Sequence, residues 1–131
     1  MKILVIDDDE GVRRTISRIL RRGGHEILTA EDGGRGMDLF LSEHPEIVIT
    51  DFFMPEHEGA ETIVRMRRAN PRIKIIAISG GGQIGGVEVL RIARSLGADE
   101  IIAKPFGAHE LLGLIGGGLK ATGETEDSVV Y

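Results

Sequence analysis

The stretch Ile47-Val48-Ile49-Thr50-Asp51-Phe52-Phe53-Met54-Pro55 decides the fold of this chain. Its first four residues are apolar or β-branched, which is typical of a strand buried on both faces in a parallel sheet. Asp51 follows where the strand leaves the sheet, and Pro55 stops any regular continuation. Ligands of open α/β sheets bind outside the carboxyl ends of the strands, so Asp51 is a candidate site residue. A lone Asp can equally cap a turn, and its meaning therefore depends on the other strands.

Composition bounds the class of protein. The 131 residues suit one domain, and the net charge of −5 argues against generic binding to nucleic acid or a membrane surface. Because there is no cysteine, disulfides and thiolate metal sites are excluded. No apolar run approaches the roughly 20 residues of a membrane helix, and acidic residues come too early for a signal peptide. We expect a cytoplasmic domain over residues 1–120, then a polar acidic tail over 121–131 that stays disordered, with no second domain.

Short apolar runs alternate with helical periodicity along the chain. Strands are predicted at 2–6, 25–30, 46–50, 73–78 and 100–103, and helices at about 10–22, 32–42, 60–69, 87–96 and 108–115. Asp9 is the expected N-cap of the first helix and Gly23-Gly24 its stop. The apolar stripes predict that the inward residues are Val12, Ile16, Ile19, Leu20, Met37, Phe40, Leu41, Ile63, Val64, Met66, Val87, Leu90 and Ala93.

This (βα)5 pattern favours an α/β fold with a doubly wound parallel sheet. With right-handed crossovers and both faces covered, the commonest strand order is 2-1-3-4-5. That order delivers polar side chains to one edge from the carboxyl ends of four strands: Asp7 and Asp8, Asp51, Ser79, and Lys104.

Such a constellation suits phosphoryl transfer to a carboxylate. Three close carboxylates repel one another unless a cation lies among them, and Mg²⁺ typically takes one or two carboxylates and keeps waters. Lys104 and Ser79 are then placed to hold phosphoryl oxygens around an Asp51 nucleophile. Two simpler interpretations stay open, namely that Asp7 to Asp9 only cap the first helix and that Lys104 only forms a salt bridge.

These residues carry a resemblance over Lys2 to about Leu119. The chain resembles a single-domain receiver of the two-component response-regulator family, with its flavodoxin-like fold. The matching motifs are Ile6-Asp7-Asp8, Asp51 with Met54-Pro55 and Gly59, Ser79, and Lys104-Pro105-Phe106.

The resemblance implies a phosphoacceptor and not an enzyme with turnover. Asp51 would accept a phosphoryl group from phosphohistidine on a histidine kinase or histidine phosphotransfer protein. Asp8, Asp51 and the Phe53 carbonyl would ligate Mg²⁺, with Asp7 acting through water. Ser79 and Lys104 would bind phosphoryl oxygens, and Lys104-Pro105 would be a cis bond.

Four positions depart from, or vary within, the family pattern. The switch residue three before the Lys is usually aromatic, and here it is Ile101, which puts the usual coupling to the phosphorylated site in doubt. Ser79 replaces the commoner Thr, while Phe53 and Gly81 flank the path of the hydrolytic water.

Phe53 is predicted to shield the acyl phosphate. Phe53→Asn should therefore speed the decay of phosphorylated protein, measured by intact mass after removal of the phosphodonor. An unchanged decay rate would contradict the prediction.

Partners and rivals remain as alternatives. Arg14 and Arg18 either belong to a solvated face or flank the surface that meets the kinase. We expect a monomer or weak homodimer, a protein target, and no nucleic acid or membrane. One rival is a haloacid-dehalogenase-like phosphatase that uses Asp7 in Asp7-x-Asp9, and the other is an unphosphorylated receiver-fold binding module.

Overall fold

The computed structural model describes residues 1–52, 58–80 and 86–116. Within them, five parallel strands form one sheet of order β2-β1-β3-β4-β5. The strands are β1 (Lys2–Ile6), β2 (Glu26–Ala30), β3 (Ile47–Asp51), β4 (Lys74–Ser79) and β5 (Glu100–Ala103). The helices are α1 (Glu10–Arg22), α2 (Gly33–Glu43), α3 (Glu58–Ala69), α4 (Gly86–Leu96) and α5 (Ala108–Gly116). The flavodoxin-like doubly wound α/β fold predicted from the sequence is confirmed. Among these helices, none has both the length and the apolar character needed to cross a bilayer.

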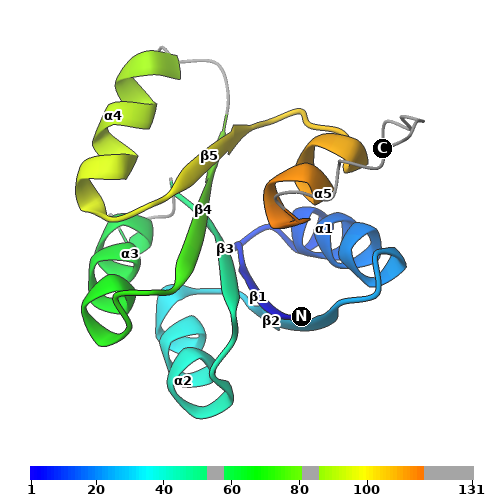
Figure 1. Cartoon of the computed structure of the whole chain (residues 1–131), viewed down its shortest axis with the longest axis horizontal. Coiled ribbons are helices and arrows are strands. Elements are labelled where there is room, and N and C mark those ends of the chain that lie inside the picture. Colours follow the sequence, from blue (N-terminus) through cyan, green and yellow to red (C-terminus); the bar gives the residue numbers. More distant parts are fainter. Residues whose placement is uncertain (53–57, 81–85, 117–131) are drawn as a thin grey trace.

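Helices cover both faces of the sheet. Figure 1 shows α1 and α5 on one face and α2, α3 and α4 on the other. Each face has its own apolar core, because alternate strand residues point to opposite sides. Leu4, Ile6 and Val48 belong to the core under α2 and α3, whereas Val5 and Ile49 belong to the core under α1 and α5. The central strand β3 is therefore buried on both sides, as its unbroken apolar run predicts.

Strand register brings the candidate site residues together. Ile6 of β1 pairs with Thr50 of β3, so the next residue of each strand, Asp7 and Asp51, leaves the sheet at the same level. On the far side of β3, Asp51 pairs with Ile78, one residue before Ser79. Asp51 and Ser79 are thus the last residues of β3 and β4, and both strands end one residue later than the sequence pattern predicts.

The first helix begins and ends where the sequence predicts. The Asp9 carboxylate accepts hydrogen bonds from the backbone N–H groups of Gly11 (2.8 Å) and Val12 (3.2 Å), which makes it the N-cap. At the other end, the Gly23 N–H donates to the Ile19 and Leu20 carbonyls. Both capping assignments are confirmed.

Two assignments of buried residues need correction. Leu41 was expected to point inward, but it is 56% exposed, because Met37 and Phe40 already define the buried stripe and Leu41 lies beyond its edge. Val64 is only half-buried, and Thr62 (4% exposed) is buried on α3. Ile63, Met66 and Ala93 are buried as expected, whereas the side chains of Val87 and Leu90 lie outside the described part of the chain.

A glycine explains how α2 packs so closely on the sheet. A Cβ atom at Gly36 would lie 2.4 Å from Cδ1 of Ile6 in β1. Glycine inside a helix costs roughly 1 kcal/mol relative to Ala, yet here it permits close packing against a core residue. Gly36, one of three glycines near the start of α2, is therefore a residue that the packing of this helix uses.

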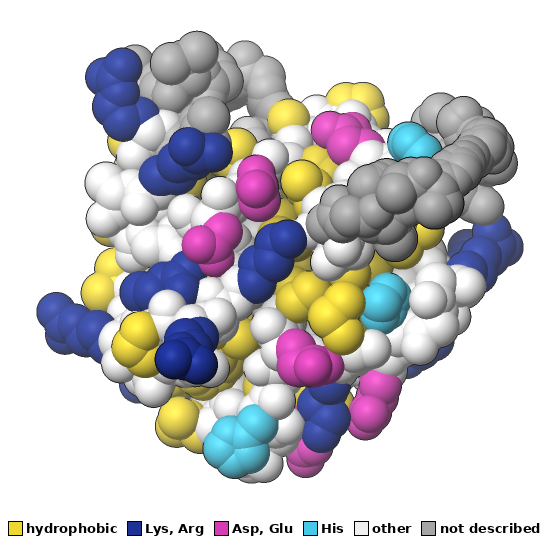
Figure 2. Space-filling model, viewed as in Figure 1, with side chains coloured by type: hydrophobic (Ala, Val, Ile, Leu, Met, Phe, Trp, Pro, Cys, Tyr) yellow, Lys and Arg dark blue, Asp and Glu magenta, His cyan; other side chains and the backbone are white. Residues whose placement is uncertain are grey.

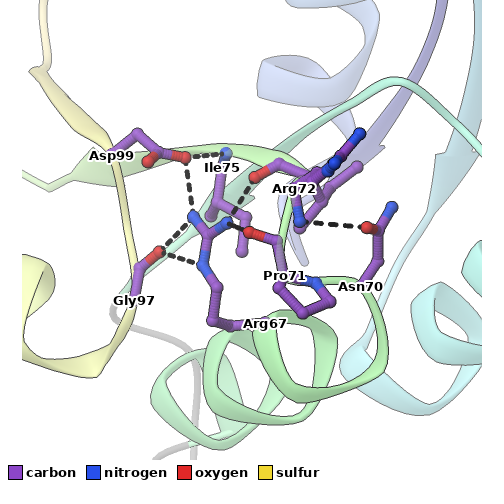
Figure 3. Close-up of polar contacts among 8 residues, drawn as sticks. Arg67, Asn70, Pro71, Arg72, Ile75, Gly97 and Asp99 are labelled. Carbon is purple, nitrogen blue, oxygen red and sulfur yellow. Dashed lines mark hydrogen bonds and ion pairs between the residues drawn. The ribbon is translucent and has the colours of Figure 1, made fainter.

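An arginine network joins α3 and the amino ends of β4 and β5, at the sheet edge away from Asp51 (Figure 3). All five N–H groups of Arg67 donate hydrogen bonds, from Nε to the Gly97 carbonyl (3.1 Å), from Nη1 to the carbonyls of Pro71 (2.9 Å) and Ile73 (2.6 Å), and from Nη2 to the Gly97 carbonyl (2.6 Å) and the Asp99 carboxylate (2.7 Å). The same carboxylate oxygen of Asp99 accepts from the Ile75 N–H (2.8 Å). This single side chain thus ties α3 to the two connections that follow α3 and α4.

Candidate functional site

Three carboxylates meet at the carboxyl edge of β1 and β3. Asp7, Asp8 and Asp51 each offer an oxygen, and these oxygens lie within 4.8 Å of one another. Asp7 is fully buried and Asp51 is 6% exposed, whereas Asp8 is exposed. The cluster is therefore a half-open acidic site with two carboxylates in its floor and one at its rim.

Asp7 has one satisfied and one unsatisfied oxygen. Its Oδ1 accepts from the Asp9 N–H (2.9 Å), while its buried Oδ2 has no hydrogen-bond partner among the described residues. Oδ2 lies 4.0 Å from Nζ of Lys104. Burial raises the pKa of Asp7, and the Asp9 N–H and Lys104 partly oppose that rise. A buried oxygen without a partner in such surroundings is a position that a cation would satisfy.

Lys104 and Ser79 reach the same edge from the neighbouring strands. Lys104 follows β5, and its backbone N–H donates to the Ser79 carbonyl (3.0 Å), which holds the two residues side by side. Both side chains are half-buried. The Lys104-Pro105 bond is cis, as predicted from the family resemblance. The structure therefore brings Asp7, Asp8, Asp51, Ser79 and Lys104 to one edge, whereas Phe53 and Gly81 lie outside the described residues.

The residues present fit a hard divalent cation. Mg²⁺ prefers oxygen ligands and commonly takes one or two carboxylates, and it retains several waters. The three clustered carboxylates and the unpartnered Asp7 Oδ2 supply that donor set. The Lys104 ammonium group, 4.0 Å from Asp7 Oδ2, and the Ser79 hydroxyl complete a site suited to phosphoryl oxygens.

A glycine allows the end of β3 to lie close to α3. A Cβ atom at Gly59 would lie 2.5 Å from the Asp51 carbonyl oxygen and 2.7 Å from that of Phe52. These are backbone atoms, so a side chain at this position forces the backbone at Asp51 and Phe52 to shift.

Gly59→Ala is expected to lower the free energy of unfolding by about 2 kcal/mol through this overpacking. Urea denaturation would measure the loss. Gly113→Ala is the matched control, since a Cβ atom there meets nothing within 4 Å and alanine favours the helix. The control should gain stability, and an equal gain for Gly59→Ala would contradict the prediction.

An apolar groove lies beside the acidic cluster. It has a volume of about 430 Å³ and runs between α1 and the segment after β5. Its lining includes Val12, Thr15, Ile16, Lys104 and Phe106. A partner seated in this groove would lie next to the Lys104 ammonium group and the three carboxylates.

Sequence analysis missed one supporting contact at the site. The guanidinium of Arg13 donates to the Asp7 backbone carbonyl (2.7 Å) and so fixes the segment that carries Asp7 and Asp8. In the sequence, Arg13 is one of five arginines in this helix, with nothing to distinguish it from the others. No spacing rule identifies an arginine that reaches back to a carbonyl six residues earlier.

Comparison with known proteins gives a consistent match. The family model for the response regulator receiver domain matches residues 3–116. Response regulator MprA of Mycolicibacterium vanbaalenii is 33% identical over 113 residues, which are 86% of this chain and 47% of that protein. The chain spans about half the length of the curated relatives it matches.

Solved structures agree with the sequence match. A response regulator receiver domain protein from Clostridium thermocellum has a TM-score of 0.80 and 30% identity, over 92% of this chain and 94% of that chain. A CheY-like receiver domain protein from Methanospirillum hungatei JF-1 has a TM-score of 0.80 and 28% identity, over the same shares of the two chains.

Proposed function

The chain belongs to the response regulator receiver family of two-component systems, and from that premise we propose that Asp51 is its phosphoacceptor. The observation that carries the proposal is the meeting of Asp7, Asp8 and Asp51 beside Lys104 at one sheet edge. A carboxylate nucleophile needs compensation of the negative charge on the incoming phosphoryl group. Lys104 would supply part of that positive charge, and the clustered carboxylates would hold the cation that supplies the rest.

The reaction is a phosphoryl transfer from phosphohistidine of a partner protein. An Oδ atom of Asp51 attacks phosphorus, a P–O bond forms, and the P–N bond to the imidazole breaks. The imidazole nitrogen takes up a proton, and an acyl phosphate remains on Asp51. Hydrolysis later breaks the new P–O bond and returns the carboxylate and inorganic phosphate. The protein thus undergoes one modification for each signal and is not a classical enzyme.

Asp8, Asp51 and the Phe53 carbonyl would hold Mg²⁺, with Asp7 contributing through water. Bound Mg²⁺ supplies charge neutralisation for the phosphoryl oxygens. Lys104 and Ser79 bind and orient those oxygens. Asp7 keeps Lys104 in place through an ion pair between Asp7 Oδ2 and Lys104 Nζ at 4.0 Å. This Oδ2 atom is buried and accepts no hydrogen bond from the described residues, so it is left to interact with the ammonium group.

The phosphodonor is a histidine kinase or histidine phosphotransfer protein. Its docking surface is the apolar groove that includes Val12, Ile16 and Phe106, because a helix seated there reaches the acidic cluster. Arg14 lies outside this groove, is exposed on α1 and forms an ion pair with Glu10 (2.7 Å), and we propose that it contacts the kinase at the periphery of the complex. Charge reversal at Arg14 that left phosphotransfer kinetics unchanged at low salt would remove it from the interface.

Phosphorylation switches a protein-interaction surface formed by α4, β5 and α5. Ile101 lies on β5, half-buried against the core that α2, α3 and α4 cover. An aliphatic side chain has no polar tip to move between solvent and core. The signal therefore passes through Ser79, Lys104 and the backbone of β5 and not through an aromatic switch.

The proposal is tested by incubation with Mg²⁺ and acetyl phosphate, followed by intact mass. One phosphoryl adduct is expected on the unmodified chain and none on Asp51→Asn. No adduct with any donor would favour the unphosphorylated binding module instead.

The phosphatase alternative needs an acidic pair on a strand after its lysine. Among the described residues, the only acid beyond Lys104 is Glu110, which is exposed on α5. Sustained turnover of p-nitrophenyl phosphate would nevertheless reinstate that alternative, whereas a single trapped phosphoryl group supports the receiver.

A further inference from the structure

A basic groove runs along the outer side of α1, on the opposite side of this helix from the apolar groove that includes Val12, Ile16 and Phe106. It has a volume of about 610 Å³ and lies between α1 and the edge strand β2, where Thr29 forms part of its wall. Five arginines of α1 line it, Arg13, Arg14, Arg18, Arg21 and Arg22. In Figure 2, basic side chains reach the right-hand margin of the molecule, where Figure 1 places α1.

The charge of this groove opposes that of the rest of the chain. Residues Glu10–Arg22 carry five arginines and one glutamate, a net charge of +4, while the whole chain carries −5. The remainder of the chain is therefore net −9. Basic residues in the last turn favour the helix dipole, which accounts for two of the arginines but not for the row that precedes them.

Two of the arginines are available to a ligand. Arg13 already donates to the Asp7 carbonyl, and Arg14 pairs with Glu10. The side chains of Arg18 and Arg21, by contrast, are exposed and form no hydrogen bond or ion pair with any described residue. They lie about one helical turn apart, so their guanidinium groups flank the same stretch of groove.

The floor of the groove contains a second, independent sign of a missing partner. Ser17 is 4% exposed and lines the groove, and its buried hydroxyl has no hydrogen-bond partner among the described residues. A buried hydroxyl without a partner costs stability. Ser17 lies next to Arg18 and four residues before Arg21, and all three line the groove, so one ligand can meet these side chains.

We propose that this groove binds an oligophosphate, a small ligand with two or more phosphate groups. Arginine recognises phosphate through paired N–H donors, and a serine hydroxyl donates to a phosphate oxygen. The span from Arg13 to Arg22 is about 13 Å, which accommodates two or three phosphate groups. Because the rest of the chain is net negative, its overall charge does not favour a longer polyanion.

The shared chemistry admits three sources, namely inorganic oligophosphate, a nucleoside polyphosphate and a phosphorylated lipid headgroup. The probes are tripolyphosphate, ATP and vesicles containing a phosphoinositide, each measured by isothermal titration or sedimentation without Mg²⁺. Equal affinity for tripolyphosphate and ATP assigns recognition to the phosphates alone, and tighter binding of ATP assigns a nucleotide. If the protein binds the phosphoinositide vesicles but neither soluble probe, and the arginine variant described below does not bind them, the ligand is assigned as the lipid headgroup.

The decisive variant is Arg18→Gln with Arg21→Gln. It should weaken tripolyphosphate binding by about tenfold for each arginine removed, since each charged hydrogen bond contributes about 1.5 kcal/mol. The matched control is Arg68→Gln with Arg94→Gln, which makes the same charge change at exposed positions on α3 and α4. Asp51→Asn should bind as the unmodified chain does, which separates this groove from the phosphoacceptor site.

Ser17→Ala provides a test that does not depend on general charge attraction, because the substitution leaves the net charge unchanged. It should raise the thermal midpoint of the free protein, because an unpartnered buried hydroxyl is removed, and it should reduce the rise caused by tripolyphosphate. Equal losses of affinity in the two double variants would overturn the proposal, as would stronger binding of an oligoglutamate peptide or of single-stranded DNA than of tripolyphosphate.

Discussion

Asp7→Asn is expected to stabilise the Mg²⁺-free protein and to remove most of its stabilisation by Mg²⁺. The gain should be about 2 kcal/mol in the free energy of unfolding, because a fully buried carboxylate with one unpartnered oxygen becomes neutral. The repulsion between Asp7 and the neighbouring oxygens of Asp8 and Asp51 disappears with the charge. A cation relieves the same repulsion, so the variant has less to gain from Mg²⁺.

The pH dependence of stability follows from the raised pKa of Asp7, whose first cause is burial. The folded protein holds this proton more tightly than the unfolded chain, in which the pKa is near its ordinary value of 3.8. Between 3.8 and the higher folded value, the folded state binds more protons, so stability falls as pH rises. The penalty is complete above the folded pKa and persists at neutral pH. Asp7→Asn should abolish this slope.

Urea denaturation across this acidic interval and at pH 7, with and without Mg²⁺, measures both effects. The apparent affinity for Mg²⁺ should fall by about 10- to 100-fold, as is usual when a group that orients metal-bound water is removed. Asp38→Asn is the control, because it makes the same chemical change at an exposed position on α2. A destabilised Asp7→Asn protein in the absence of Mg²⁺ would contradict this account of the site.

Much of the fold was predictable because its signals are local. The apolar run before Asp51 specifies a central strand, and the alternation of such runs with helical periodicity allows few topologies. Asp7, Asp51, Ser79 and Lys104 could be placed at one edge because strand ends in a parallel sheet share an edge. The error at Leu41 arose because periodicity locates a stripe but not its margin, which depends on how α2 sits over β1.

What sequence could not predict depends on backbone atoms brought together by the fold. Gly59 was noticed only as part of a motif, and its reason, close contact with the carbonyls of Asp51 and Phe52, is geometric. Ser17 gave no signal, since its burial follows from the position of α1 over the sheet. Arg67 looked like one more arginine at the end of a helix, but four of its five hydrogen bonds go to main-chain carbonyls. No side-chain pattern encodes such partners.

Arg67→Lys should therefore be strongly destabilising although it preserves the charge. A lysine ammonium has three donors at a single point, whereas the guanidinium delivers five in a plane to partners from the connections after α3 and α4. Carbonyls of Ile73 and Gly97 would lose their donors, and Asp99 would lose its ion pair at 2.7 Å. We expect a loss of about 3 kcal/mol in the free energy of unfolding, the range associated with breaking a partly buried network.

The adjacent residue provides the control. Arg68→Lys changes an exposed side chain on the same turn of α3 and should stay within about 0.5 kcal/mol of the unmodified chain. Because the network lies at the sheet edge away from Asp51, Arg67→Lys should still gain one phosphoryl group from acetyl phosphate below its thermal midpoint. Equal stability of the two variants would show that the Arg67 contacts contribute little. Loss of phosphorylation in a folded Arg67→Lys protein would instead show that the two edges of the sheet are coupled through β4 and β5.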